Sequence, residues 1–227
     1  MTELTIALKT IFDWLKENYP RLEESFEPAL DFEQLKVYDD RLNDIHFTSE
    51  FYELYQWSNG TLTYPAGEII NIDGKFGVLD DGGYLSNLEE SHNNIFDTID
   101  CIEPFSAIFF CPMESIDFVS CRKEGDNRNI VYLQPFLFGT NGGSELIFSN
   151  EKKYTSTLLS SVPDIENCFE PVYASLTDKF VDLAKSIKAE AYFTEDTKYG
   201  KALFVDQSKI CRKHRIYSND EDWLFLE

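Results

Sequence analysis

Residues 51–60 of the chain read Phe51-Tyr52-Glu53-Leu54-Tyr55-Gln56-Trp57-Ser58-Asn59-Gly60. The apolar side chains of Phe51, Leu54 and Tyr55 recur at the i, i+3 and i+4 spacing of one helical face. Four aromatic residues of this stretch precede a polar Ser-Asn-Gly end, where the helical pattern stops. The stretch therefore predicts a short amphipathic helix with an abrupt end.

Signals on both sides of this helix fix its ends. Thr48 or Ser49 can cap the first turn through its hydroxyl, and Glu50 places a negative charge where the helix dipole favours one. Asn59-Gly60 suits the left-handed backbone that commonly ends a helix. We expect the helix to begin near Ser49 and to end before Gly60.

Two further helices are expected, one near each end of the chain. The amino-terminal helix is ended by Pro20, and its apolar face consists of Leu4, Leu8, Ile11, Phe12 and Leu15. An acidic stretch containing Pro28 follows it. The carboxyl-terminal helix has an apolar face made of Leu176, Phe180, Leu183, Ala184 and Ile187. Ser175 and Asp178 before and within it resemble a capping box in which Asp replaces Glu.

Between Leu62 and Phe148 the helical period is lost, and short apolar runs alternate with Gly, Asn and Asp clusters. These runs predict strands at Glu68–Ile72, Ala107–Cys111, Ile116–Cys121, Ile130–Phe138 and Ser144–Phe148. Asn141-Gly142 between two apolar runs predicts a tight hairpin. We therefore expect an α+β fold with the helices packed on a central mixed or antiparallel sheet. Residues 1–190 would form one domain, with residues 191–227 as an extension packed on it.

The chain is strongly acidic, with 41 Asp and Glu against 20 Lys and Arg and a net charge of -21. The first 150 residues hold 27 acidic and 9 basic residues and so carry -18 of this charge. A hydrophobic fraction of 43% shows that the charge covers a folded body. Such a surface repels phosphate backbones and anionic lipid, which argues against nucleic-acid or membrane-surface binding, and it attracts a basic partner. Solubility alone is the alternative reason for the charge.

The amino terminus shows no secretory signal, and we expect a cytoplasmic protein with reduced cysteines. No metal or other cofactor is expected, because Cys101, Cys111, Cys121, Cys168 and Cys211 form no close pairs with metal-ligand spacing. A thiol and imidazole pair of Cys111 with His46 or His92 has no support from spacing.

Catalytic motifs are also missing from the sequence. Gly142-Gly143-Ser144-Glu145-Leu146 lacks the second glycine of a serine-hydrolase elbow, and no phosphate-binding glycine loop is present. The basic cluster at residues 209–215 lies beside Asp220, Glu221 and Asp222, so we interpret it as local charge compensation. These observations favour a protein that is not an enzyme.

Several segments resemble, in order, the SUKH superfamily. Residues 51–60 resemble its helix with an aromatic-rich end. The later segments resemble, in turn, a strand and the segment after it (76–79 and 85–90), a short element (111–116), a sheet hairpin with a glycine-rich turn (136–148) and the lead into a closing helix (168–176). The resemblance spans about residues 3–190. The sequence differs from the family at Thr140-Asn141, where an Asp often precedes the glycines, and it has no family match after Tyr192.

The resemblance implies a protein-binding module. Many bacterial members are immunity proteins that neutralise a polymorphic toxin, often a nuclease or deaminase, whereas fungal relatives regulate cell-wall assembly and signalling. An acidic immunity protein could occlude the basic nucleic-acid site of a toxin, as in a toxin-antitoxin pair. A regulatory or scaffold protein of the same fold with a non-toxin partner is the alternative.

Candidate residues for partner binding are aromatic or acidic positions at the predicted helix end and in or beside predicted turns: Trp57, Asp80, Asp81, Tyr84, Asp126 and Glu145. Residues expected to shape the fold are Asn59, Gly60, Asn141, Gly142 and Gly143. For Trp57 and Gly60 the alternative roles are core packing and helix capping.

Overall fold

The structure is a computed structural model of the chain. The residues described are 1–18, 20–23, 26–42, 45–61, 64–65, 69–72, 75–79, 84–85, 110–116, 118–122, 129–136, 144–149, 157–161, 168–198, 200–217 and 224–225. Among them, helices and antiparallel sheets occur together, so the chain belongs to the α+β class.

The described α-helices are α1 (Glu3–Asn18), α2 (Pro20–Glu23), α3 (Phe32–Asp39), α4 (Ser49–Trp57) and α6 (Leu176–Lys188). Short 3-10 helices are η1 (Asp40–Leu42), η3 (Met113–Ser115) and η5 (Gln207–Lys209). The predicted helices α1, α4 and α6 are confirmed. Thr48, and not Ser49, caps α4 by accepting the Phe51 N–H, and Ser175 caps α6 by accepting the Asp178 N–H.

The described strands form three sheets in which every pairing is antiparallel. A six-stranded sheet has the order β12-β9-β8-β7-β6-β5, and a four-stranded sheet has the order β10-β11-β3-β2. Strands β1 and β4 form a separate pair. The strand bounds are β1 (Tyr64–Pro65), β2 (Ile69–Ile72), β3 (Lys75–Leu79), β4 (Tyr84–Leu85), β5 (Phe118–Arg122), β6 (Asn129–Phe136), β7 (Ser144–Ser149), β8 (Thr157–Ser161), β9 (Cys168–Tyr173), β10 (Tyr192–Thr197), β11 (Gly200–Val205) and β12 (Leu224–Phe225).

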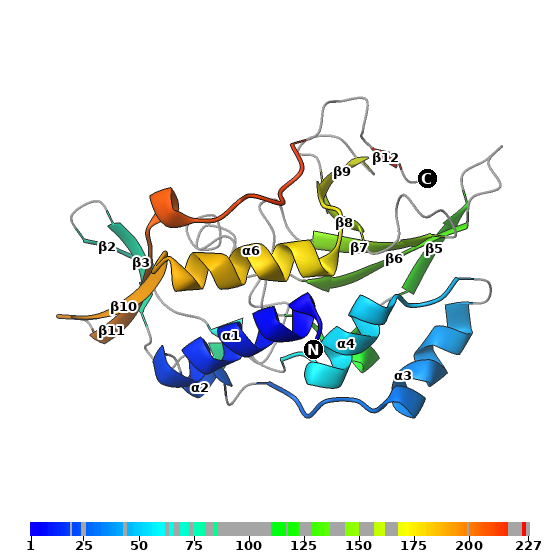
Figure 1. Ribbon diagram of the computed structural model, residues 1–227, viewed down its shortest axis with the longest axis horizontal. Coiled ribbons are helices and arrows are strands. Elements are labelled where there is room, and N and C mark those ends of the chain that lie inside the picture. The colour runs from blue at the N-terminus through cyan, green and yellow to red at the C-terminus, as the bar shows by residue number, and fades with distance from the viewer. Residues whose placement is uncertain are drawn as a thin grey trace.

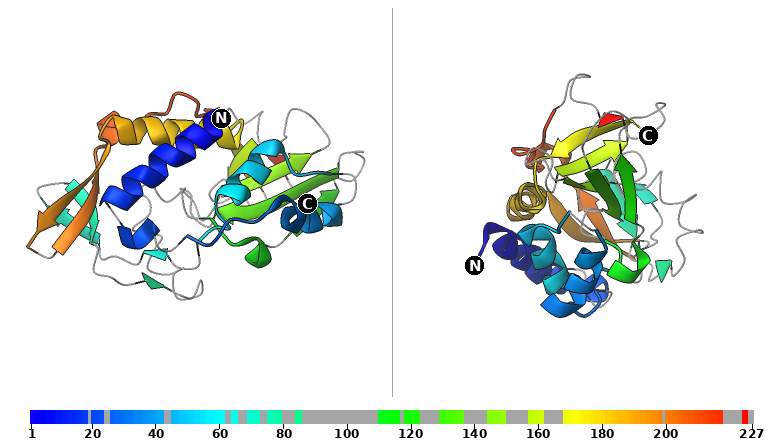
Figure 2. Two further views of the ribbon diagram at one scale, coloured as in Figure 1. Left: turned by 60° about the horizontal axis from the view of Figure 1, so that its bottom comes forward. Right: turned by 90° about the vertical axis from the view of Figure 1, so that its right-hand side faces the viewer.

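The described strands are divided between sheets, whereas one central sheet was expected. Strand β3 pairs with β2 on one side and with the late strand β11 on the other, so the hairpin β10–β11, and not β5 to β9, completes the sheet of β2 and β3. Figures 1 and 2 show the four-stranded and six-stranded sheets at opposite ends of α6.

One strand prediction is wrong where it can be compared with the structure. Phe110 and Cys111 belong to no strand, and residues 107–109 of the same predicted strand lie outside the described residues. The carbonyl of Phe110 accepts the Thr61 N–H at 2.9 Å, and the carbonyl of Cys111 accepts the Tyr55 hydroxyl at 2.9 Å. These two carbonyls therefore bond to α4 and the residues after it, and not to a neighbouring strand.

The segment after α6 is tied to the rest of the fold at several points. Within it, Ala202 pairs with Leu79 of β3, and Lys201 Nζ donates a 2.9 Å hydrogen bond to the carbonyl of Asn18 at the end of α1. Strand β12 pairs with β9 in the six-stranded sheet. Residues beyond 191 thus contribute strands to both larger sheets.

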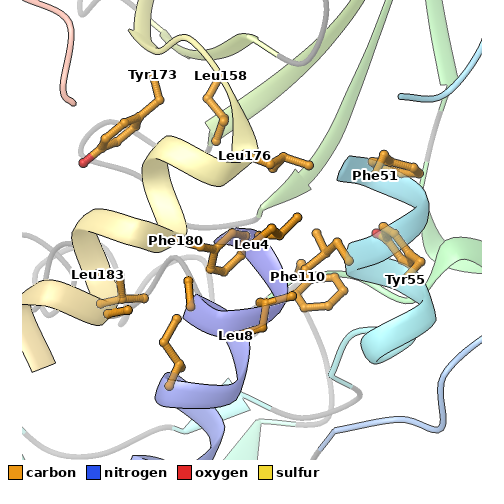
Figure 3. Close-up of a cluster of buried hydrophobic side chains, with 14 of the residues drawn as sticks. Leu4, Leu8, Phe51, Tyr55, Phe110, Leu158, Tyr173, Leu176, Phe180 and Leu183 are labelled. Atoms are coloured by element: carbon orange, nitrogen blue, oxygen red, sulfur yellow. The ribbon is translucent and has the colours of Figure 1, made fainter. Parts of the chain in front are cut away.

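The core lies where α1, α4 and α6 meet (Figure 3). Leu4 and Leu8 of α1 approach Phe180 of α6, while Phe51 and Tyr55 of α4 enter the same cluster, and all five side chains are buried. Burying a large apolar side chain contributes about 1.5–3 kcal/mol, so the amphipathic faces read from the sequence hold the three helices together. Of the helices described, none has the length and apolar character needed to cross a membrane.

Candidate partner-binding surface

The end of α4 is locked to the segment that begins η3. Asn59 is buried, its side-chain oxygen accepts the Met113 N–H at 3.0 Å, and its side-chain amide donates to Glu114 Oε2 at 3.2 Å. Gly60 has φ +83°, and a Cβ there would lie 2.4 Å from the Phe110 carbonyl oxygen. The Asn-Gly pair therefore ends the helix and also lets a distant backbone segment pack directly against it.

Trp57 lies in a cluster of aromatic rings. Its ring contacts Phe12 and Phe26 edge to face, at centroid distances of 5.7 and 5.2 Å, and stacks on Phe110 at 6.4 Å. These contacts give the half-buried Trp57 a packing role between α1, α4 and the segment before η3. Its contact with a partner stays a prediction.

The other candidate residues are only partly within the described structure. Asp80, Asp81, Asp126 and the turn residues Asn141, Gly142 and Gly143 lie outside the described residues. Tyr84 pairs with Pro65 in the β1–β4 pair, whereas Glu145 pairs with Leu159 inside the six-stranded sheet. Tyr84 and Glu145 thus belong to different sheets.

A buried carboxylate fixes the loop between α3 and α4. Asp39 accepts the Phe47 N–H at 2.6 Å and the Tyr52 hydroxyl at 3.1 Å, and His46 Nδ1 lies 3.3 Å from the same carboxylate. Burial, followed by the negative charge of Asp39 and the hydrogen bond to it, raises the pKa of Tyr52 to about 12. The phenol therefore stays a neutral donor to Asp39 across the physiological pH range.

Helix α3 was not predicted from the sequence, although a signal for it is present. Asp31 accepts the Gln34 N–H, and the Gln34 side chain accepts the Asp31 N–H, which together form a capping box. The motif Asp-x-x-Gln could have revealed this helix. Leu35 is the only buried apolar residue of this helix, so the sequence has no apolar repeat there that would indicate a helix.

The outer face of α3 exposes two large apolar side chains. The exposed fraction is 52% for Phe32 and 57% for Val37. Phe32 also stacks on Tyr52 of α4, with ring centroids 5.2 Å apart and planes inclined by 22°. Glu33 and Asp40 are exposed on the same helix or at its end, so apolar and acidic groups share this face.

A second buried carboxylate ties the basic cluster to α6. Asp182 accepts the His214 N–H at 2.8 Å, His214 Nδ1 lies 2.6 Å from it, and Cys211 Sγ lies 3.4 Å from it. Ser186 accepts the Cys211 N–H at 2.8 Å. Asp220, Glu221 and Asp222, the expected compensating acids, lie outside the described residues, whereas Asp206 lies 3.7 Å from Lys209.

The buried Asp and Cys side chains in the described part of the chain make contacts within the fold. Within the described ranges no three His, Cys, Asp or Glu side chains are grouped to hold a metal ion. Cys111 is a buried thiol, and His46 lies beside Asp39. Compared with protein-family models, curated proteins and solved structures, the chain has no significant match.

Proposed function

We propose that this chain is a protein-binding module of the SUKH type, acting as an immunity protein that neutralises a cognate basic toxin. Its acidic surface occludes the basic site through which the toxin, in the simplest case a nuclease, holds its nucleic acid. The chain performs no chemistry of its own in this role. Its negative charge supplies the electrostatic complementarity that speeds and orients association with a basic protein.

The observation that best supports this proposal is the contact between Asn59 and residues 113–114. Residues 51–60 and 111–116 resemble consecutive elements of the family, and this contact joins them through two side-chain hydrogen bonds. Gly60 allows the backbone of residues 110–111 to approach as closely as it does. Two segments that resemble the family in sequence are thus neighbours in space, as parts of one structural framework would be.

The distribution of charge along the chain supports a basic binding partner. Most of the net charge of -21 belongs to the first 150 residues, whereas residues 151–227 hold 14 acidic and 11 basic residues. A nuclease toxin presents a positive cleft to phosphate groups, so a negative surface can compete for that cleft.

Growth rescue tests the proposal directly. The gene immediately upstream of this chain's gene is expressed from an inducible promoter, with and without this chain, and growth and co-purification are scored. We expect the upstream product to arrest growth, the chain to restore it, and the two proteins to purify together. Lysozyme, an unrelated basic protein, serves as the control for unspecific charge attraction. Failure of both rescue and co-purification would overturn the immunity proposal.

Binding to the upstream product without growth arrest would support the regulatory or scaffold alternative. The position of the gene separates the two proposals as well, because an immunity gene is expected directly downstream of its toxin gene. Turnover that disappears on substituting a single His or Cys would contradict both.

A further inference from the structure

The exposed side chains of α3 form one continuous surface, and its Phe32 edge packs on Tyr52 of α4. At 100° per residue, Phe32, Lys36, Asp40, Glu33 and Val37 follow one another across an arc of about 140°. All five are exposed, whereas Leu35 and Asp39, which lie just beyond the Phe32 edge of this arc, are buried. These five residues define the α3 face, in which apolar side chains flank a row of charged ones.

This surface is held rigid by its surroundings. The capping box of Asp31 fixes the start of the helix, and buried Asp39 fixes its end through the Phe47 N–H and the Tyr52 hydroxyl. The stacking of Phe32 on Tyr52 also sets the orientation of the exposed ring. A preorganised surface loses little conformational entropy when a partner binds.

Glu33 is exposed on the α3 face, unlike the two glutamates of α4. In α4, Glu50 accepts a 2.5 Å hydrogen bond from Thr177, and Glu53 accepts hydrogen bonds from Thr2 and Thr5, so both carboxylates are used inside the fold.

Exposed acids outnumber exposed bases around the α3 face. Asp31, Glu33 and Asp40 are exposed there with Lys36, which pairs with Asp40 at 2.8 Å. Arg41, just beyond the helix, lies over the Tyr38 ring at 4.9 Å. Negative charge therefore remains in excess beside the two apolar side chains.

We propose that the α3 face is the docking surface for the basic partner, which places separate apolar side chains against Phe32 and Val37 and Lys or Arg beside Glu33, between them. This inference rests on the proposed function and names the surface that carries it out. Protein interfaces combine apolar and aromatic anchors with charged groups, and the α3 face supplies both kinds of side chain. A second copy of this chain is a poor occupant, since each copy carries a charge of -21.

The apolar part of the surface is tested by Val37→Arg, with Ile6→Arg as the matched control. Ile6 is exposed by 47% on α1, so both substitutions replace an exposed apolar helix residue with the same cation. The affinity of each variant for the upstream gene product is measured by titration calorimetry. We expect Val37→Arg to weaken binding about tenfold or more, and Ile6→Arg to leave it within about twofold.

The acidic part is tested by Glu33→Lys, with Glu3→Lys as its control. Both glutamates lie in the first turn of a helix, so the two variants share the same change in net charge and a similar change at a helix dipole. We expect Glu33→Lys to weaken binding about tenfold, mainly through a slower association rate at low salt. Thermal unfolding midpoints of both variants equal to that of the unmodified chain would show that folding is unaffected.

The outcomes separate this inference from the proposed function. If the unmodified chain binds the upstream product and both α3 variants bind equally well, the docking surface is wrong and the proposed function stands. If the unmodified chain neither binds nor rescues growth, both are overturned. Sedimentation analysis that shows a dimer broken by Val37→Arg would also overturn the inference, because a second copy would then occupy the face.

Discussion

The side-chain oxygen of Asn59 accepts a 3.0 Å hydrogen bond from the backbone N–H of Met113, and both residues are buried. The bond crosses 54 positions of sequence and links the end of α4 to η3. A buried backbone N–H without an acceptor costs about 1–3 kcal/mol, so this side chain has a structural reason to be an amide or another acceptor. The same amide donates to Glu114, which makes Asn the best fit.

Asn59→Asp is expected to lower the free energy of unfolding by about 1–3 kcal/mol. The new carboxylate can still accept the Met113 N–H, but it loses the donor to Glu114 and faces that residue's negative charge. Urea denaturation measures the loss. Adding Glu114→Gln should recover part of the stability, because the amide of Gln can donate to the carboxylate. A double variant no more stable than Asn59→Asp would contradict this account of the contact.

Gly60→Ala and Gly200→Ala separate backbone strain from steric conflict. Both glycines have positive φ, +83° and +127°, but only Gly60 has backbone atoms within 3 Å of the added Cβ. Strain costs about 1–3 kcal/mol at such positions, and overpacking adds about 1–3 kcal/mol. We expect Gly60→Ala to be the more destabilising variant in thermal and urea unfolding. Equal losses for the two variants would show that the approach of residues 110–111 is not tight.

The Tyr52 phenol provides a pH-dependent prediction. Its pKa is raised to about 12 in the folded protein, by burial first and by Asp39 second, whereas an unfolded tyrosine titrates near 10. The stabilisation from the neutral phenol is therefore complete below pH 10 and is lost as the pH rises through 12. The difference in phenolate absorbance between the unmodified chain and Tyr52→Phe reports this group alone.

The Tyr52 difference titration has an internal control in Asp39→Asn. Removing the charge of Asp39 should move the midpoint of the Tyr52 transition down, while burial keeps it above that of a free tyrosine. A Tyr52 transition near pH 10 in the unmodified chain would show that neither the burial of Tyr52 nor its bond to Asp39 is maintained in solution.

Asp182→Asn is expected to loosen residues 206–216. Asp182 is buried and bonds both the backbone and the ring of His214, so replacing its carboxylate removes one acceptor and its charge, at about 1–3 kcal/mol. Hydrogen exchange should quicken in residues 206–216 more than in α1. Asp178→Asn, in the first turn of the same helix, is the control and should change stability by less than about 1 kcal/mol. Equal exchange in both variants would contradict the anchoring role.

The sequence predicted the parts of the fold that local periodicity controls. Helices α1, α4 and α6 have three or more apolar residues on one face together with capping residues, and both signals are local. The pairing of β3 with β11 could not be predicted, because it joins Val78 to Leu203, which are far apart in the sequence. Such a pairing depends on which strand edge the tertiary fold leaves open. Phe110 and Cys111 were misassigned as strand because an apolar run does not reveal whether its carbonyls bond a strand or a helix end.

The binding surface was the least predictable feature. Sequence reasoning favoured acidic turns and Trp57, but the ring of Trp57 packs against three other aromatic rings. The sequence does not predict the α3 face, because a Phe or Val is expected in the core until the position of its helix in the fold is known. Exposure depends on the tertiary arrangement, which for Phe32 and Val37 leaves α3 at the edge of the helical layer (Figure 1).

The salt dependence of binding tests the central claim most directly, because that claim is electrostatic docking of an acidic protein on a basic one. The dissociation constant of the complex with the upstream gene product is measured by titration calorimetry at about 0.05 M and about 0.5 M salt, which shortens the screening length about threefold. We predict binding at low salt that weakens about tenfold or more at high salt. Binding that persists undiminished at high salt would contradict the electrostatic account, and no binding at low salt would contradict the partnership itself.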